Sequence, residues 1–297
     1  MKRFISIIII CLFFAANSLY VFAQKPAHEL SAYSSLGLSS LRYELLQGTS
    51  SGRFGGDFGV GYTYYRTNER VTKTGSVYYS QWGIFTGLGL GWYNAKAKLN
   101  NGERISEGLK DNEGDSFILT TKLSEYEEKQ RVMCLNIPVM AQFSAGLFYA
   151  MGGIKTSVPL QGKYKSTVAA LQNEAYYPEL DNWLKTQTFA GYGPFKDQTY
   201  DGKIDFRINV MLSFEAGVNK SVSKNCVLYC GMYFDYGLNN VDKGERLKFI
   251  NYSADNPKDF TLNSVLSSYS DNSKSVTFTD NIKAMATGIK FRVAFRK

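Results

Sequence analysis

The segment KIDFRINVMLSFEAGVN, residues 203–219, alternates apolar and polar side chains without a break. A period of two is typical of a β-strand whose two faces meet different surroundings. The apolar row from Ile204 to Val218 would measure roughly 46–50 Å, whereas strands of soluble sheets usually span about 17–20 Å. A strand of that length, tilted by about 45°, crosses a lipid bilayer. The segment therefore predicts a membrane-spanning strand.

The same alternation recurs seven more times along the chain, so we expect about eight such strands. The other candidates are residues 30–45, 54–64, 78–92, 133–143, 148–160, 227–239 and 285–295. In the first of them the apolar positions change from even to odd numbers near Ser39, which predicts a β-bulge there. Pro138 and Pro159 lack a backbone donor, so each should mark a local bulge or a strand end.

The connections between these candidates are short at one end and long at the other. Residues 144–147 and 220–224 suit tight turns, whereas tens of residues follow Tyr93, Gln161 and Asn240. This pattern favours an all-β fold, a closed antiparallel transmembrane β-barrel with short periplasmic turns and long extracellular loops. Ten strands fit if the loops contain another hairpin. A soluble sandwich or a lipocalin-like barrel explains the same alternation if the apolar face points inward.

Two features favour lipid on the outside of the barrel. Trp82 and Trp92 are ten residues apart, about 24 Å along the membrane normal at 45° tilt, which matches the ~25 Å between aromatic girdles. The opposite faces of the strands carry glycines and charged residues, as the packed lumen of a small barrel requires. We expect a paired lumen network of five residues: Asp57, Arg207, Glu215, Asp235 and Arg292.

The amino-terminal residues have the layout of a secretory signal. Lys2 and Arg3 precede a short apolar stretch that ends in small residues at Ala23. We predict a signal peptide over residues 1–23 and a single barrel domain over residues 24–297, exported to the cell outer membrane. Lys and Arg outnumber Asp and Glu by 34 to 26. These charges are scattered, and no nucleic-acid partner is expected.

Several segments resemble the PorT-like family of outer-membrane β-barrels. The run CLNIPVM at 134–140 followed by LFYAMGG at 147–153 is similar to one of its strand pairs, and 38–43 leading into 59–64 is similar to its opening hairpin. FDYGLNN at 234–240 and the closing strand GIKFRVAF at 288–295 extend the resemblance over most of the chain. The resemblance implies an eight-stranded barrel of the OmpA-like size class and implies no catalytic residue.

The sequence offers little for catalysis or for metal binding. Barrel enzymes generally use a histidine as general base, and His28 is the chain's single histidine, near the predicted periplasmic end. The glycines of 87–91 alternate within a strand instead of preceding a helix, so they do not bind a nucleotide. Asp111, Glu113 and Asp115 lack EF-hand spacing. We expect no enzyme activity, no cofactor and no metal site.

The region from Lys163 to Gly202 is rich in aromatic residues, which suit either a binding surface or a self-packed cap. The candidate binding residues are Tyr176, Tyr177, Trp183, Phe189, Tyr192 and Phe195. We therefore expect a monomer with a structural or binding role, in contact with outer-membrane lipid and lipopolysaccharide, whose loops bind an extracellular protein or glycan. The alternatives are a narrow transport channel and a PorT-type secretion or assembly component.

Overall fold

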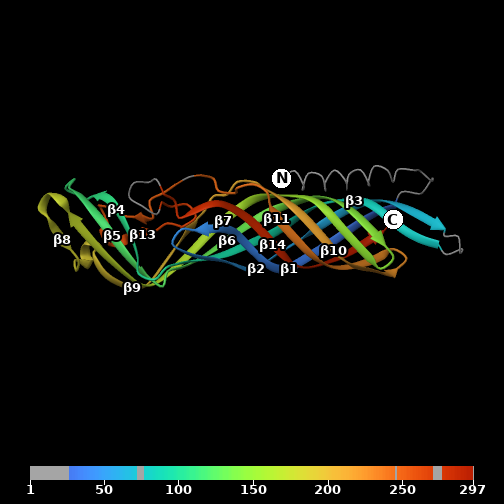
Figure 1. Ribbon diagram of the computed structural model, residues 1–297, viewed down its shortest axis with the longest axis horizontal. Helices are drawn as coiled ribbons and strands as arrows, with labels where there is room; N and C mark the ends of the chain where they lie inside the picture. Colours follow the sequence, from blue (N-terminus) through green and yellow to red (C-terminus); the bar gives the residue numbers. More distant parts are fainter. Residues whose placement is uncertain (1–26, 72–76, 245, 270–275, 297) are drawn as a thin grey trace.

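The computed structural model describes residues 27–71, 77–244, 246–269 and 276–296. Antiparallel β-strands make up nearly all of the regular structure, and they form an elongated body with β4, β5 and β8 gathered at one extremity (Figure 1). None of the helices among those residues is long and apolar enough to cross a membrane. The predicted signal peptide, residues 1–23, lies outside the described residues.

Eight strands pair in chain order and close into a ring, which we call the barrel. The strands are β1 (Ala27–Leu45), β2 (Gly48–Val71), β3 (Val77–Leu99), β6 (Glu127–Ala145), β7 (Phe148–Tyr177), β10 (Asn209–Ser223), β11 (Cys226–Gly237) and β14 (Thr279–Arg296). The pairing of β1 with β14 and of β7 with β10 completes the ring. The expected closed antiparallel barrel is confirmed, with eight strands and not ten.

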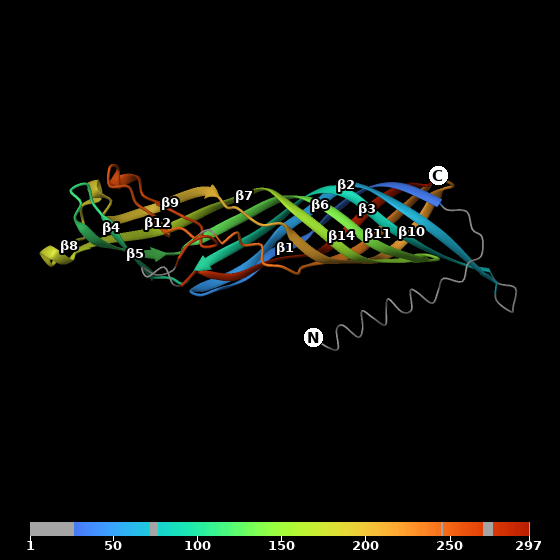
Figure 2. The same ribbon diagram turned by 90° about the horizontal axis from the view of Figure 1, so that it is seen from above.

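The remaining elements project from one end of the barrel and form what we call the extension. It comprises residues 163–177 of β7, the shorter strands with three 3₁₀-helices, and the segment 241–278 as far as it is described (Figure 2). The elements are β4 (Glu103–Lys110), β5 (Ser116–Ser124), β8 (Asn182–Leu184), β9 (Gly193–Lys203), β12 (Ile250–Asn251), β13 (Thr261–Leu262) and the 3₁₀-helices η1 (Pro178–Leu180), η2 (Thr188–Ala190) and η3 (Pro257–Asp259). The hairpin of β4 and β5 is thus present, but it pairs with β7 outside the ring.

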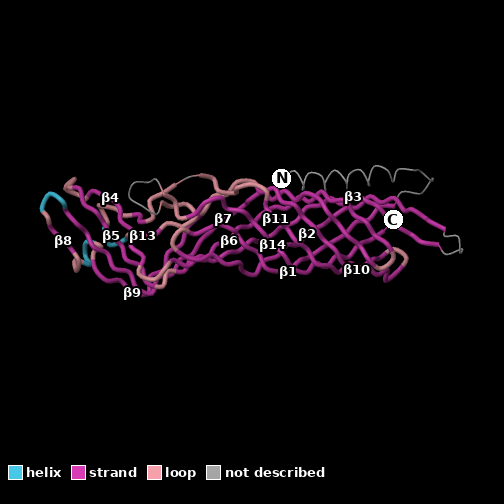
Figure 3. Tube along the Cα trace, in the orientation of Figure 1, coloured by secondary structure: helices cyan, strands magenta, loops and turns pink. Residues whose placement is uncertain are grey.

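Connections at the two ends of the barrel differ as the sequence predicts. Two residues join β6 to β7, and two join β10 to β11, at the end that we call the short-turn end. The long connections run to the opposite end, where Figure 3 shows most of the loop traces. The turn between β1 and β2, Leu46 and Gln47, is an exception because it is tight yet lies at the long-loop end.

Side chains of the barrel strands obey one rule of orientation. Apolar residues point outward in a continuous belt, of which the more exposed members include Leu36, Phe58, Leu88, Val139, Phe214, Met232 and Phe291. Polar, glycine and aromatic residues alternate with them on the inner face. Glycine is required where rings cross the interior: a Cβ at Gly89 would collide with the hydroxyl of Tyr33.

Pro159 marks a local bulge, as predicted, whereas Pro138 marks neither a bulge nor a strand end. The pairing of β3 with β6 skips the positions around Pro138, between Thr86↔Val139 and Gly89↔Asn136, but its register is the same on both sides and β6 continues to Ala145. At Pro159, the register between β6 and β7 shifts by one residue, which is a β-bulge. Proline has no N–H, so in a regular ladder the carbonyl opposite it on the neighbouring strand would lack a donor. The interrupted pairing avoids this.

The expected bulge near Ser39 is wrong. Odd-numbered residues of β1 from Glu29 to Tyr43 are buried, except the partly buried Gly37, so the strand keeps its phase through Ser39. Its register with β14 shifts only between Arg42 and Glu44. The apolar positions switch parity because the surroundings change. Leu36 and Leu38 face outward from the belt, whereas Leu41 faces an apolar interior.

The segment 203–219 is also not one strand. β9 ends at Lys203 and β10 begins at Asn209, and the residues between them form only an isolated bridge from Phe206 to Asp242. Ile204 is buried in the core of the extension, whereas Phe214 and Val218 face outward from the belt. The alternation is continuous because the apolar residues are even-numbered in both regions. They face the core in the extension and face outward in the barrel.

Candidate functional site

The middle of the barrel holds a buried ionic triad from three strands. Lys155 of β7 places Nζ 2.6 Å from Oδ2 of Asp235 and 3.6 Å from Oδ2 of Asp57. Ser213 donates to the other oxygen of Asp235 at 2.6 Å, and Ser35 donates to Asp57. All five side chains are buried. A buried lysine shared between two carboxylates, with hydroxyl donors on both, satisfies its charges locally.

A second group of charges lies closer to the short-turn end. Lys290 places Nζ 2.9 Å from Glu215, which also accepts a 2.7 Å hydrogen bond from the hydroxyl of Tyr149. The guanidinium of Arg292 lies 4.0 Å from the ring centre of Tyr229 and donates to Gln142 at 3.0 Å. Arg292 is 1% exposed, so aromatic rings replace much of its solvent.

A third group closes the short-turn end. Glu29 is fully buried and lies 3.3 Å from Arg296. The hydroxyls of Tyr65 and Tyr229 donate to its two oxygens at 3.2 and 3.1 Å. Acidic and basic residues therefore alternate through the interior, and paired side chains occupy it at three levels.

The predicted lumen network is placed in part. Asp57, Glu215, Asp235 and Arg292 lie inside the barrel. Arg207 does not, because it precedes β10; it is exposed and donates from Nη2 to the carbonyl of Lys243 at 3.1 Å.

Sequence reasoning missed Lys155 as the central cation and did not pair Lys290 with Glu215. The sequence signal that could have found Lys155 is its odd residue number, which places it on the inner face of its strand. Lys155 shares its odd-numbered face with Tyr149, Met151 and Ser157, all of which are buried. A lysine on the same face as buried residues has to find carboxylates within the barrel.

The two tryptophans of the predicted girdle point outward from β3. The ring of Trp82 lies 4.6 Å from that of Phe143, and the ring of Trp92 lies 5.6 Å from that of Phe58. Between them the outer face carries Ile84 and Leu88, which are 59% and 53% exposed. The two indoles therefore border the apolar belt on this strand.

The extension has a hydrophobic core, which continues into the long-loop end of the barrel through Leu41, Tyr93 and Met211. β5 and β7 contribute Phe117, Leu119 and Val168, and the segment 241–278 covers them with Phe249, Leu262 and Phe278. All six are no more than 1% exposed. The long segment between β11 and β14 is therefore the second layer of a packed structure.

Glu128 fastens this second layer to the sheet. Its two oxygens accept hydrogen bonds from Ser264 Oγ at 2.6 Å, the Val265 N–H at 3.0 Å and the hydroxyl of Tyr126 at 2.7 Å. Burial raises the pKa of this carboxyl, and the hydrogen bonds from Ser264 and Gln130 oppose that rise. Glu107 of β4 makes a similar contact with the N–H of Ile250, at 3.0 Å.

The six aromatic residues proposed as a binding surface do not lie together on one face. Tyr192 is buried, and Tyr177 and Phe195 are partly buried against the core of the extension. Tyr176 packs against Trp183 with ring centres 4.8 Å apart and the rings tilted by 31°. Trp183 and Phe189 are 48% and 69% exposed near the tip. The set thus divides into core residues and a smaller exposed group.

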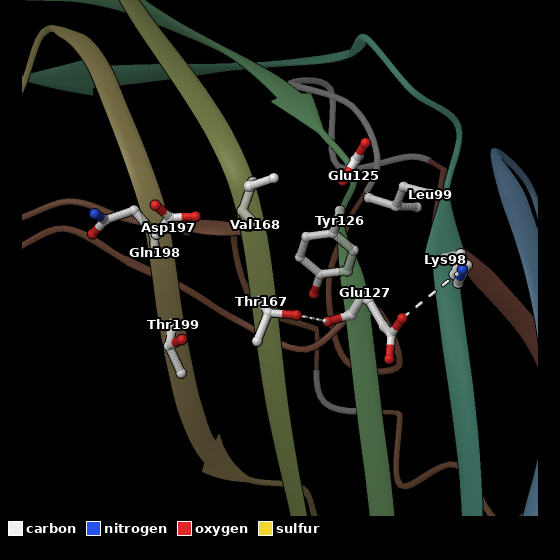
Figure 4. Close-up of a pocket in the computed structure, with 11 residues that line it drawn as sticks. Lys98, Leu99, Glu125, Tyr126, Glu127, Thr167, Val168, Asp197, Gln198 and Thr199 are labelled. Carbon is white, nitrogen blue, oxygen red and sulfur yellow. Dashed lines mark hydrogen bonds and ion pairs between the residues drawn. The ribbon is translucent and has the colours of Figure 1, made fainter.

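A pocket of about 740 Å³ lies where the barrel meets the extension (Figure 4). β7 passes there from pairing with β6, which ends at Thr167↔Glu127, to pairing with β5, which begins at Ala170↔Ser124. Glu125 and Asp197 flank this gap with φ of 53° and 51°, a left-handed backbone. The carboxylate of Glu127 is held by Lys96 at 2.6 Å. The pocket is open and mixed in charge.

Two minor sequence features have structural roles. Asp111 accepts hydrogen bonds through Oδ1 from the N–H groups of Glu113 and Asp115, so the acidic cluster folds into a turn. His28 lies on the outer surface with Nδ1 2.6 Å from the hydroxyl of Tyr62. Among the described residues no group of His, Cys, Asp and Glu is arranged to hold a metal ion.

Comparison with known proteins gives only distant similarity. No family model matches, and no curated protein matches significantly. Ail, the attachment invasion locus protein of Yersinia pestis, aligns at 10% identity and a TM-score of 0.30 in complex with the heparin analogue sucrose octasulfate, covering 91% of this chain and 99% of that one. Neisserial surface protein A aligns at 9% identity and 0.27, covering 91% and 99%. Similarity at this level supports no inference about the present chain.

Proposed function

We propose that the chain is an integral outer-membrane protein that holds a rigid extension outside the cell for binding a partner protein or ligand. The observation that carries the proposal is the reversal of side-chain polarity along continuous strands. The barrel exposes an apolar belt suited to lipid, and the extension buries its apolar residues under a charged surface. Such a molecule is suited to a position in which the barrel lies in a bilayer and the extension lies in water.

A role in transport has less support. Side chains with 0–8% exposure fill the barrel at the level of Asp57, Glu215 and Glu29, and eight strands enclose little more than side chains. We therefore assign the barrel the role of anchor, not of conduit. Catalysis is likewise outside the proposal, since the single histidine lies on the outer surface against Tyr62.

Fractionation and gel mobility test the barrel. The protein should remain with the outer membrane and migrate faster before boiling than after. A product that is soluble in the periplasm without detergent would contradict the proposal.

Cysteine labelling on intact cells tests the orientation. Asn182→Cys near the tip should react with a membrane-impermeant maleimide on intact cells, whereas Lys224→Cys in a short turn should react only after the outer membrane is permeabilised. Of the described native cysteines, Cys134 is buried and Cys230 lies on the belt; Cys226, which is partly exposed beside the short turn, is replaced by serine in both variants. Labelling of both sites, or of Lys224→Cys alone, would contradict the orientation.

The motifs at 134–140 and 147–153 favour one second candidate, a PorT-type secretion or assembly component. They form the paired strands β6 and β7, as the resemblance implies. Co-purification of the tagged chain with a defined set of proteins would support this candidate, and recovery of a lone heat-modifiable monomer would count against it.

A further inference from the structure

A second pocket lies on the extension, between the hairpin of β4 and β5 and the segment that carries β12. Its volume is about 550 Å³, within the range of pockets that bind small molecules. Leu109 and Ile118 come from the hairpin, Pro178 from η1, and Ala254 from the covering segment. Four separate stretches of chain therefore converge on one concave surface.

An aromatic framework holds the pocket in shape. Phe117 and Tyr252 line it, with ring centres 5.5 Å apart at an angle of 76°. Behind them, the hydroxyl of Tyr252 lies 3.5 Å from that of Tyr192, which lies 3.2 Å from that of Tyr177. Because these rings are already fixed by one another, a ligand would not have to order them on binding.

The charges on the pocket have a single sign. Lys110 and Lys248 line it, and no carboxylate residue does. Lys248 donates to the carbonyl of Gly108 at 2.9 Å, which leaves its other ammonium protons for a ligand. By contrast, the pocket at the base of the extension is lined by Glu125, Glu127 and Asp197 together with a single lysine, Lys98.

Two of the neighbouring carboxylates, those of Asp111 and Glu107, are engaged elsewhere. Asp111 accepts two backbone N–H groups and the hydroxyl of Tyr177 at 3.1 Å, and Glu107 accepts the N–H of Ile250. Glu113 and Asp115 lie exposed on the turn beyond β4. The two lysines thus keep their charge available at the rim of an apolar, aromatic wall.

We propose that this pocket binds an amphiphilic organic anion, in which one sulfate, sulfonate or carboxylate group is carried on an aromatic or saccharide ring. The anion pairs with Lys110 and Lys248, and the ring lies against Tyr252 and the aliphatic wall. The proposal deepens the binding role given above and relies on it only for access to ligand outside the cell, because binding itself is measured on purified protein.

Calorimetric titration of the full-length protein in non-ionic micelles tests the proposal. The probes are naphthalene-2-sulfonate and a monosulfated disaccharide, each beside its uncharged analogue. The charged probe should bind at least about tenfold more tightly than the uncharged one, and added salt should weaken its binding. Whether the aromatic or the sugar anion binds identifies the source of the ligand.

Variants locate the site. Lys110→Gln and Lys248→Gln should each weaken binding by about tenfold, and Ala254→Trp should abolish it by filling the pocket. Lys122→Gln, on an exposed position of β5, is the matched control and should bind as the native protein does. Gel mobility before boiling shows that the barrel of each variant is folded, and Trp183 fluorescence in a Trp82→Phe, Trp92→Phe background shows that the extension of each lysine variant is folded. Unchanged binding in the Lys110→Gln, Lys248→Gln double variant, or no binding of either anion at millimolar concentration, would overturn the proposal.

These results do not depend on cell-surface display. If tip labelling fails on intact cells while the purified protein binds the anion, the proposed orientation is wrong and the pocket stands. If labelling succeeds and the titrations fail, the display role stands and the pocket assignment is wrong.

Discussion

The barrel and the extension share the long strand β7, yet they bury opposite kinds of side chain. In the barrel, Leu88 and Phe291 face outward, and Lys155 and Glu215 are buried. In the extension, Leu119 and Phe249 are buried, and Lys122 faces water. Alternation along a strand therefore fixes which residues share a face, but the chemistry of the surroundings decides which face is buried.

β1 shows how abrupt this change is. Leu38 is 62% exposed on the belt, and Leu41, three residues later on the other face, is 2% exposed in the core. The backbone continues without a phase shift between them. Where β1 passes from the belt to the core, the outer face stops carrying the apolar residues and the inner face begins to carry them, while the strand does not rotate.

The largest effect should come from removing the central cation of the barrel. Lys155→Met leaves Asp57 and Asp235 buried without their shared partner, which should lower the free energy of unfolding by about 3–5 kcal/mol. Urea titration of the reconstituted protein, read by gel mobility, measures the loss. The triple variant Asp57→Asn, Lys155→Met, Asp235→Asn should recover most of it. A single variant as stable as the native protein would show that the interior is hydrated.

A leucine deletion should cost more in the extension than on the belt. Leu119→Ala leaves a cavity in a packed core and should cost about 3–5 kcal/mol. Leu36→Ala, facing outward, should cost about 2 kcal/mol, because lipid chains refill the space. In a Trp82→Phe, Trp92→Phe background, Trp183 fluorescence follows the extension alone, and gel mobility follows the barrel. Equal losses would contradict the difference in surroundings.

A charge placed on the belt should be costly only at the level of the membrane. Leu88→Arg lies about midway between Trp82 and Trp92 and should cost about 2–4 kcal/mol in lipid vesicles. The matched change on the extension, Thr120→Arg on β5, should cost about 1 kcal/mol for its lost hydrogen bond to Ser106. Urea titration in vesicles compares them. If Leu88→Arg left the free energy of unfolding unchanged, we would conclude that the outer face of β3 does not contact lipid.

The hydrogen bonds of Glu128 to the covering segment should contribute less than the central cation of the barrel or the buried leucine of the extension. Glu128→Ala removes the acceptor for Ser264 and Val265 and should cost about 1–3 kcal/mol. Because burial raises the pKa of Glu128 above its unfolded value, the folded protein retains this proton to higher pH. The free energy of unfolding should therefore fall as the pH rises from the unfolded-state pKa through the folded-state pKa.

Glu128→Gln provides the control for that pH dependence. The glutamine variant should lose the decline, while its stability at low pH stays near that of the native protein. Trp183 fluorescence in urea at several pH values measures both. The same slope in the two proteins would assign the pH dependence to another group.

Periodicity was sufficient for the barrel because each strand pairs with its neighbour in sequence. β6 and β7 follow directly from two runs joined by Gly146 and Leu147, and the bulge at Pro159 follows from a missing donor. The interior partners were partly readable, since Asp57 and Asp235 fall on the inner parity of their strands. Their counterion, Lys155, lies on a third strand far away in sequence.

The covering layer of the extension could not be read from the sequence. Phe249, Leu262 and Phe278 are spaced irregularly among Ser, Asn and Asp, and they contact strands more than a hundred residues earlier. Contacts between residues so far apart produce no periodic pattern of apolar residues in the local sequence. The same distance hid the pocket beneath β12, because Lys110 and Lys248 are separated by the whole of β5 to β11.

β7 belongs to both regions as one strand of thirty residues, Phe148–Tyr177. It is flanked by β6 and β10 in the barrel and by β5 and β9 in the extension. A pull on the tip would therefore load these ladders in shear along the strand axis, so that many hydrogen bonds resist together instead of unzipping singly. In the orientation that we propose, β7 would carry the load on a ligand bound at the tip to the barrel as one unbroken strand.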